Sequence, residues 1–140
     1  MKSIYIYSLP LFFSLLINTT WATEDTVSKE QAATTVTNYI NALSQGDILA
    51  IKGLLGGKLS GKRENLLNNP SYSNMLLNIY ADVEYEILDS SIDNENNIVV
   101  DVVIIFNSQE TMKTRFIING INTMGGVTSY KIIDETELQN

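Results

Sequence analysis

Hydrophobic positions follow a helical period in the first half of the chain and a strand period in the second. The first helix is expected to begin at a capping box formed by Ser28 and Gln31 and to end at Gly46. Within it, apolar residues recur at steps of three and four and so share one face: Ala32, Val36, Tyr39, Ile40 and Leu43.

Shorter helical segments follow. Asp47 is placed to cap a second helix, which Gly56–Gly57 would end, and a further turn or two is expected around residues 66–67. Asn69 can cap the last helix with Pro70 in its first position. The apolar residues of that helix again fit one face: Tyr72, Met75, Leu76, Ile79 and Tyr80.

The period changes to two after Asp82. Residues 83–87, 98–106, 112–118 and 127–133 read as strands joined by short connections, and 98–106 is apolar enough to be central. Helices grouped before an antiparallel meander predict a single α+β domain in which the helices cover one face of the sheet.

Alternation along 98–106 assigns its side chains to two faces. Asp101 would lie away from the helices, where Arg115 or Lys113 of the next strand can reach it. Four apolar side chains would share that outer face: Val99, Val103, Ile105 and Ile117. An exposed apolar sheet face is typical of an interface, so we expect a homodimer; the alternative is a monomer in which the charged residues keep this face hydrated.

The first 22 residues have the pattern of a secretory signal peptide. Lys2 precedes an apolar run over residues 4–17, and Thr20 and Ala22 supply small residues for cleavage. The run is too short to span a bilayer, and no second one follows. We therefore expect an exported chain of residues 23–140, periplasmic or secreted, without a membrane span.

The amino-acid composition limits the kinds of catalysis, metal binding and partner that are expected for this chain. The chain contains no histidine and no cysteine, which removes the usual general base and the usual zinc ligands. Its net charge of −7 argues against nucleic acid as a partner. No metal or other cofactor is expected. Four basic residues gather within one segment, as an anion-binding patch, a contact for an acidic partner or simply a solvated face: Lys52, Lys58, Lys62 and Arg63.

Two segments carry a resemblance to a known family. Residues 36–47 (Val-x-x-Tyr-Ile-x-Ala-Leu-x-x-Gly-Asp) and 130–134 (Tyr-Lys-Ile-Ile-Asp) resemble the first helix and last strand of the nuclear transport factor 2-like superfamily, in particular ketosteroid isomerases. The resemblance implies a cystatin-like cone, in which helices pack on the concave face of a curved antiparallel sheet and the mouth takes a small apolar molecule. Seven residues are candidates to line it: Tyr39, Met75, Tyr80, Tyr85, Phe106, Phe116 and Tyr130.

The catalytic residues that the resemblance implies are mostly absent. Tyr39 falls where the isomerases place an oxyanion-stabilising tyrosine, but residues 55–60 and 115–118 lack the carboxylates of that mechanism. We therefore expect a non-catalytic domain that binds a small apolar ligand or a protein partner. The alternative is an isomerase- or cyclase-like enzyme that uses Tyr39 and a carboxylate such as Asp82 or Asp101, and a third possibility is a purely structural dimer module.

Overall fold

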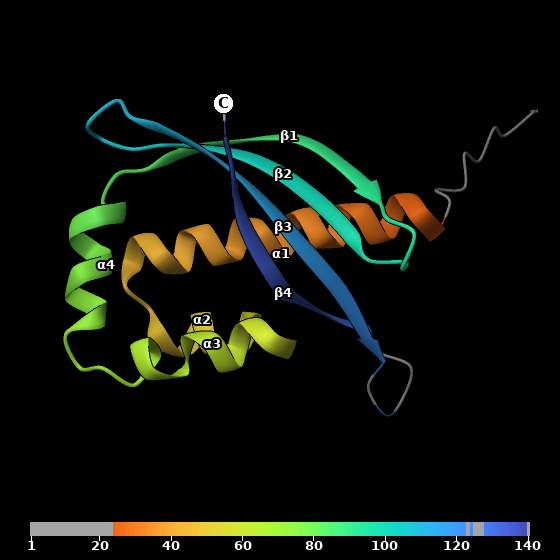
Figure 1. Cartoon of the computed structure of the whole chain (residues 1–140), viewed down its shortest axis with the longest axis horizontal. Helices are drawn as coiled ribbons and strands as arrows, with labels where there is room; N and C mark the ends of the chain where they lie inside the picture. Colours follow the sequence, from red (N-terminus) through yellow and green to blue (C-terminus); the bar gives the residue numbers. More distant parts are fainter. Residues whose placement is uncertain (1–23, 123, 125–127, 140) are drawn as a thin grey trace, which may run out of the picture.

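The computed structural model describes residues 24–122, 124 and 128–139, which form four helices followed by a four-stranded sheet (Figure 1). The predicted signal peptide, residues 1–22, lies outside these residues. The helices are α1 (Glu24–Gln45), α2 (Ile48–Leu54), α3 (Gly57–Leu67) and α4 (Tyr72–Tyr80). The strands are β1 (Glu84–Ile92), β2 (Ile98–Ile105), β3 (Thr111–Asn122) and β4 (Thr128–Leu138).

The sheet is an antiparallel meander in the order β1-β2-β3-β4, which confirms the predicted α+β class. Figure 1 shows the strands curving over α1, with α2 and α3 below them and α4 at one end. Two bulges interrupt the register, one between Ile87 and Asp89 in β1 and one in the β3–β4 ladder beside Ile117.

The core lies between α1 and the inner face of the sheet. Along β2, buried and half-buried residues alternate, so the predicted assignment of faces is confirmed. The buried residues from β2 and α1 include Val100, Val102, Ile104, Val36, Ile40 and Leu43. Among the described residues, no helix has the length and apolar character needed to cross a membrane.

Helix boundaries agree with the sequence at Asp47 and Gly46 and differ elsewhere. The Asp47 carboxylate accepts a hydrogen bond from the backbone N–H of Ala50 at 3.0 Å, as a cap should. Gly46 has φ +61°, and a Cβ there would lie 2.7 Å from the Ser73 hydroxyl, so glycine permits the close contact with α4. The predicted start at Ser28 is wrong, because α1 already includes residues from Glu24 onward.

Two other predictions need correction. The segment expected to hold a turn or two is an 11-residue helix that begins at Gly57 itself. Gly56 donates its N–H to the carbonyl of Ile132 at 2.9 Å, so it separates two helices by contacting β4. Pro70 is not in the last helix: α4 begins at Tyr72, and the Asn69 side chain accepts from the backbone of Ser71 instead.

The last strand is also longer than predicted. It was expected to end at residue 133, whereas β4 continues to Leu138. The five additional residues pair with β3 and carry a carboxylate, Glu135, into the region between the helices and the sheet.

Candidate functional site

Four polar side chains from different elements meet between the helical layer and the sheet. The Glu135 carboxylate on β4 accepts hydrogen bonds at one oxygen, Oε2, from Tyr39 Oη of α1 (3.2 Å) and from Arg63 Nη2 of α3 (2.9 Å). Arg63 Nη1 in turn donates to Tyr72 Oη at the start of α4, at a longer 3.4 Å. We call these four residues the mouth network.

The strand register explains why Glu135 points inward. Glu135 pairs with Phe116 across β3 and β4, and Phe116 is a fully buried inner-face residue. Tyr39 packs edge-on against Phe116, with ring centroids 5.9 Å apart, so the same aromatic contact brings its hydroxyl to the carboxylate. Helix α3 packs against β4 and supplies Arg63 from the third side.

Burial controls the electrostatics of the two tyrosines nearest the carboxylate. Burial, followed by the negative charge of Glu135, raises the pKa of Tyr39. The same two causes raise the pKa of the half-buried Tyr80. Both phenols are therefore neutral hydrogen-bonding groups over the physiological pH range.

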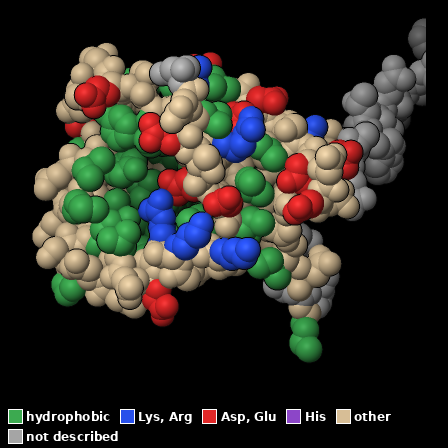
Figure 2. Space-filling model, in the orientation of Figure 1, with side chains coloured by type: hydrophobic (Ala, Val, Ile, Leu, Met, Phe, Trp, Pro, Cys, Tyr) green, Lys and Arg blue, Asp and Glu red, His purple; other side chains and the backbone are tan. Residues whose placement is uncertain are grey.

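The ion pair is accessible from one side. The side chains of Arg63 and Glu135 are 25% and 16% exposed. Figure 2 shows hydrophobic side chains around a hollow between the positions of α4 and β4, with basic and acidic side chains at its edge. The half-buried rings of Tyr80 and Phe106 pack together near this region at 5.6 Å between centroids. The arrangement combines apolar surface with a small number of fixed polar groups.

The structure brings some of the predicted lining residues together. Tyr39 and Phe116 are in contact but fully covered, and Tyr80 contacts Phe106. Tyr85 is half-buried on β1, on the inner face, because it pairs with the buried Ile104.

Two other predicted residues lie apart from this group. Met75 is exposed on α4. Tyr130 lines a separate polar hollow with Asp25 and Asn119, and its hydroxyl hydrogen-bonds to the Ser28 side chain at 3.4 Å.

The carboxylates proposed from the sequence are not the ones beside Tyr39. Asp82 is exposed in the turn before β1. Asp101 lies on the outer face, where Arg115 holds it through two hydrogen bonds of 2.7 Å, and this pairing holds the pKa of Asp101 below its usual range. The predicted pairing of Asp101 is confirmed, with Arg115 as the partner.

Sequence reasoning did not identify Glu135 or Tyr72 as site residues, and it named Arg63 only as a member of the basic segment. Ile132 is buried on the inner face, so simple alternation would place residue 135 on the outer face. The register shift opposite Ile117 inserts one extra residue, Ile133, and returns Glu135 to the inner face. No pattern in a single sequence indicates such a bulge.

The predicted basic segment does not act as one patch. Arg63 turns inward to Glu135, and Lys52 donates to the Asn68 side chain at 2.8 Å. Lys58 and Lys62 line a hollow of about 670 Å³ whose other charged groups are acidic: Asp93, Glu95 and Asp134. Over the described ranges, no three acidic residues gather closely enough to hold a metal ion.

Comparison of the chain with protein-family models, with curated proteins and with solved structures finds no match.

Proposed function

We propose that this protein is a non-catalytic binding domain that holds a small, largely apolar ligand at the mouth between α3, α4 and β4. The observation that carries the proposal is the mouth network beside an apolar hollow, in which the buried Tyr39 and Tyr72 hold the partly exposed Arg63 and Glu135. Because the chain contains no histidine, the usual general base, we take the network to orient a ligand rather than to transfer its protons.

The proposed family is the nuclear transport factor 2-like superfamily. What supports it is the order of elements, with a long first helix, two short helices and a fourth before a meander whose concave face they cover. Export to the periplasm or beyond the cell rests on residues 1–22 and stays a prediction.

A titration followed by nuclear magnetic resonance tests the ligand site. The probes are ring compounds that carry one carboxylate or one hydroxyl. Amide shifts are expected on α3, α4 and β4, and Tyr80→Leu should weaken binding about tenfold because it removes an aromatic surface. The matched control is Leu49→Ala, since Leu49 is 81% exposed on α2.

The proposal is wrong if no probe moves these amides. Native mass spectrometry of the chain isolated from its own cells then distinguishes the alternative. If the isolated chain carries a second protein and no small molecule, its partner is a protein and not a ligand.

The contact between Tyr39 and Glu135 favours a second candidate, a proton-transfer enzyme of the isomerase or cyclase type. Here Tyr39 would stabilise an oxyanion and Glu135 would take the place of the carboxylate sought in the sequence. Deuterium exchange next to the carbonyl group of small cyclic ketones tests it: exchange catalysed by the native chain and lost in Glu135→Gln supports the enzyme. Exchange no faster than in buffer excludes it for these ketones.

We also propose a homodimer through the outer sheet face. Val99, Val103, Ile105 and Ile117 share this face and remain only half-buried in one chain. Sedimentation at micromolar concentration should give the mass of two chains, and Val103→Arg should give one. The control, Leu49→Arg, should leave two; a native chain that sediments as one contradicts the dimer.

A further inference from the structure

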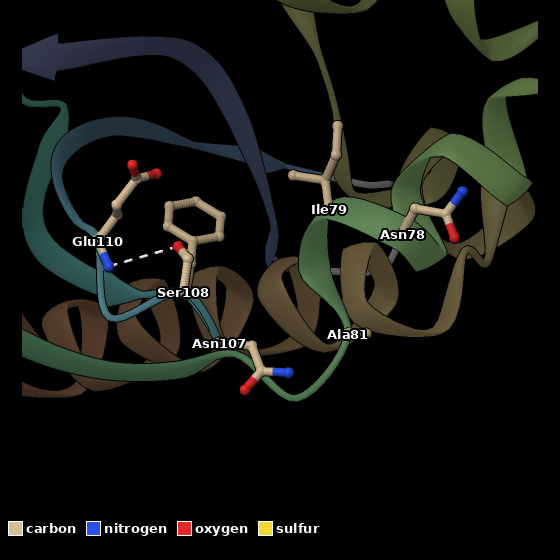
Figure 3. Close-up of a pocket in the computed structure, with 7 residues that line it drawn as sticks. Asn78, Ile79, Ala81, Asn107, Ser108 and Glu110 are labelled. Atoms are coloured by element: carbon tan, nitrogen blue, oxygen red, sulfur yellow. Dashed lines mark hydrogen bonds between the residues drawn. The ribbon is translucent and has the colours of Figure 1, made fainter.

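A second hollow lies where the C-terminal end of α4 faces the turn that joins β2 to β3. Its volume is about 320 Å³. In Figure 3, Asn78 and Ile79 of α4 lie on one side, and Ser108 and Glu110 of the turn lie on the other. This volume is at the lower end of the range for ligand pockets, so the hollow suits one small molecule.

The turn that forms one wall is held by its own hydrogen bonds. Phe106 donates its N–H to the carbonyl of Glu110 at 2.9 Å, and Gln109 donates back to the carbonyl of Phe106 at 2.8 Å. The Ser108 hydroxyl accepts from the N–H of Glu110 at 3.4 Å (Figure 3). A wall fixed in this way needs little ordering when a ligand binds.

The lining of the hollow has an apolar part and a polar part. The apolar part consists of Ile79, Ala81 and the ring of Phe106, and this ring contacts the ring of Tyr80, which is not part of the lining. An aromatic ring that is fixed by a neighbour can offer its surface to a flat apolar group.

The polar part offers both donors and acceptors. Asn78 and Asn107 each carry an amide with two N–H donors and a carbonyl acceptor, Ser108 carries a hydroxyl and Glu110 a carboxylate. The lining contains no lysine or arginine. A phosphate or another anion would therefore meet the Glu110 carboxylate without a compensating charge.

We propose that this hollow is a binding site for a sugar. A sugar ring has an apolar C–H face for Phe106 and hydroxyl groups around its edge, each of which donates and accepts hydrogen bonds. A purely aliphatic ligand would cover the aromatic ring but would make no hydrogen bonds to the exposed polar side chains at its edge, Asn78, Asn107, Ser108 and Glu110. This site goes beyond the proposed function, because its polar residues are separate from the mouth network.

Nuclear magnetic resonance titration of the whole chain with methyl glycosides of a hexose, a pentose and an N-acetylhexosamine tests the site. Amide shifts are expected at residues 78–81 and 106–110, with a dissociation constant of about 1 mM for at least one sugar, as befits a shallow site. Cyclohexanol, which has a similar ring but one hydroxyl, should bind at least tenfold more weakly.

Variants separate the two parts of the site. Asn107→Ala should weaken sugar binding about three- to tenfold, the effect of one or two hydrogen bonds. Phe106→Leu keeps apolar volume but removes the ring, and a similar or larger loss is expected. Asn74→Ala is the matched control, because Asn74 is an exposed asparagine of α4 outside the hollow, and it should change nothing.

Three results would overturn the proposal: no shifts with any sugar at about 50 mM, well above the expected constant; shifts that map outside the hollow; or cyclohexanol binding as well as the sugars. Each of these results can occur while the site at the mouth network still binds its own probes. The sugar site can therefore be disproved without disproving the proposed function.

Discussion

Each face of the sheet carries one arginine–carboxylate pair in the described part of the chain, and the two pairs have different surroundings. On the inner face, Arg63 binds Glu135, and a buried tyrosine donates to the same carboxylate oxygen. On the outer face, Arg115 binds Asp101 through two short hydrogen bonds, and the arginine side chain is 46% exposed.

The comparison shows that hydrogen-bond geometry and energetic importance need not agree. The outer pair has the better geometry, but its arginine side chain is 46% exposed and the pair joins two strands that are already paired. The inner pair joins α3 to β4 and, through Tyr39 and Tyr72, reaches α1 and α4 as well. Removing Glu135 would leave the buried Tyr39 hydroxyl without its partner and would take the charged partner from the partly exposed Arg63, which is a costly change.

The largest effect is expected from removing the inner carboxylate. Glu135→Ala should lower the free energy of unfolding by about 2 kcal/mol, less than for a fully buried pair because Arg63 is partly exposed. Urea unfolding measures the change. Glu137→Ala is the control, since Glu137 is an exposed carboxylate on the same strand, and it should change stability by less than about 0.5 kcal/mol. Equal effects for the two variants would contradict the role of the network.

A smaller effect is expected from removing only the Tyr39 hydroxyl. Tyr39→Phe keeps the contact with Phe116 and should cost about 1 kcal/mol at neutral pH. Because burial raises the pKa of Tyr39, the folded chain keeps the phenol proton above pH 10 while the unfolded chain loses it. Stability should therefore fall as the pH rises through this range.

Unfolding experiments at alkaline pH test the contribution of the Tyr39 hydroxyl by itself. Urea unfolding between pH 9 and pH 11 should show a less steep loss of stability in Tyr39→Phe than in the native chain. The control is Thr34→Ala, which removes an aliphatic hydroxyl that does not lose its proton between pH 9 and pH 11 and should leave the slope unchanged. An identical slope in Tyr39→Phe and the native chain would mean that the Tyr39 hydroxyl is not buried.

The difference between the faces also explains what the sequence could predict. The alternation from Ile98 to Ile105 is regular, so it identified the faces of β2 and the outer position of Asp101. The helix–sheet order and the cap at Asp47 follow from equally local patterns.

The inner site depends on features that are not local. Glu135 faces inward only because of the bulge at Ile133, and Arg63 reaches it only because α3 extends over 11 residues from a glycine start. The sequence shows the residues of the mouth network, but it does not show that four elements bring them together. Tyr39 was identified because it lies on the apolar face of a regular helix, in a segment that resembles the isomerases, whereas no such signal marked its partner Glu135.

The smallest effect is expected on the outer face and is best seen at acid pH. Hydrogen bonding from Arg115, followed by its positive charge, lowers the pKa of Asp101, so the folded chain binds fewer protons at this group than the unfolded chain. Its stabilising effect is therefore complete above the ordinary pKa of about 3.9 and is lost as the pH falls below that value. Asp101→Asn should cost less than about 1 kcal/mol at pH 7, and the difference from the native chain should shrink between pH 4 and pH 2.

Glu86→Gln, on the same face opposite Val103, is the control for a general change in surface charge. A loss in Asp101→Asn as large as that in Glu135→Ala would mean that the elements each pair joins do not decide its importance, and the energetic distinction between the faces would be lost.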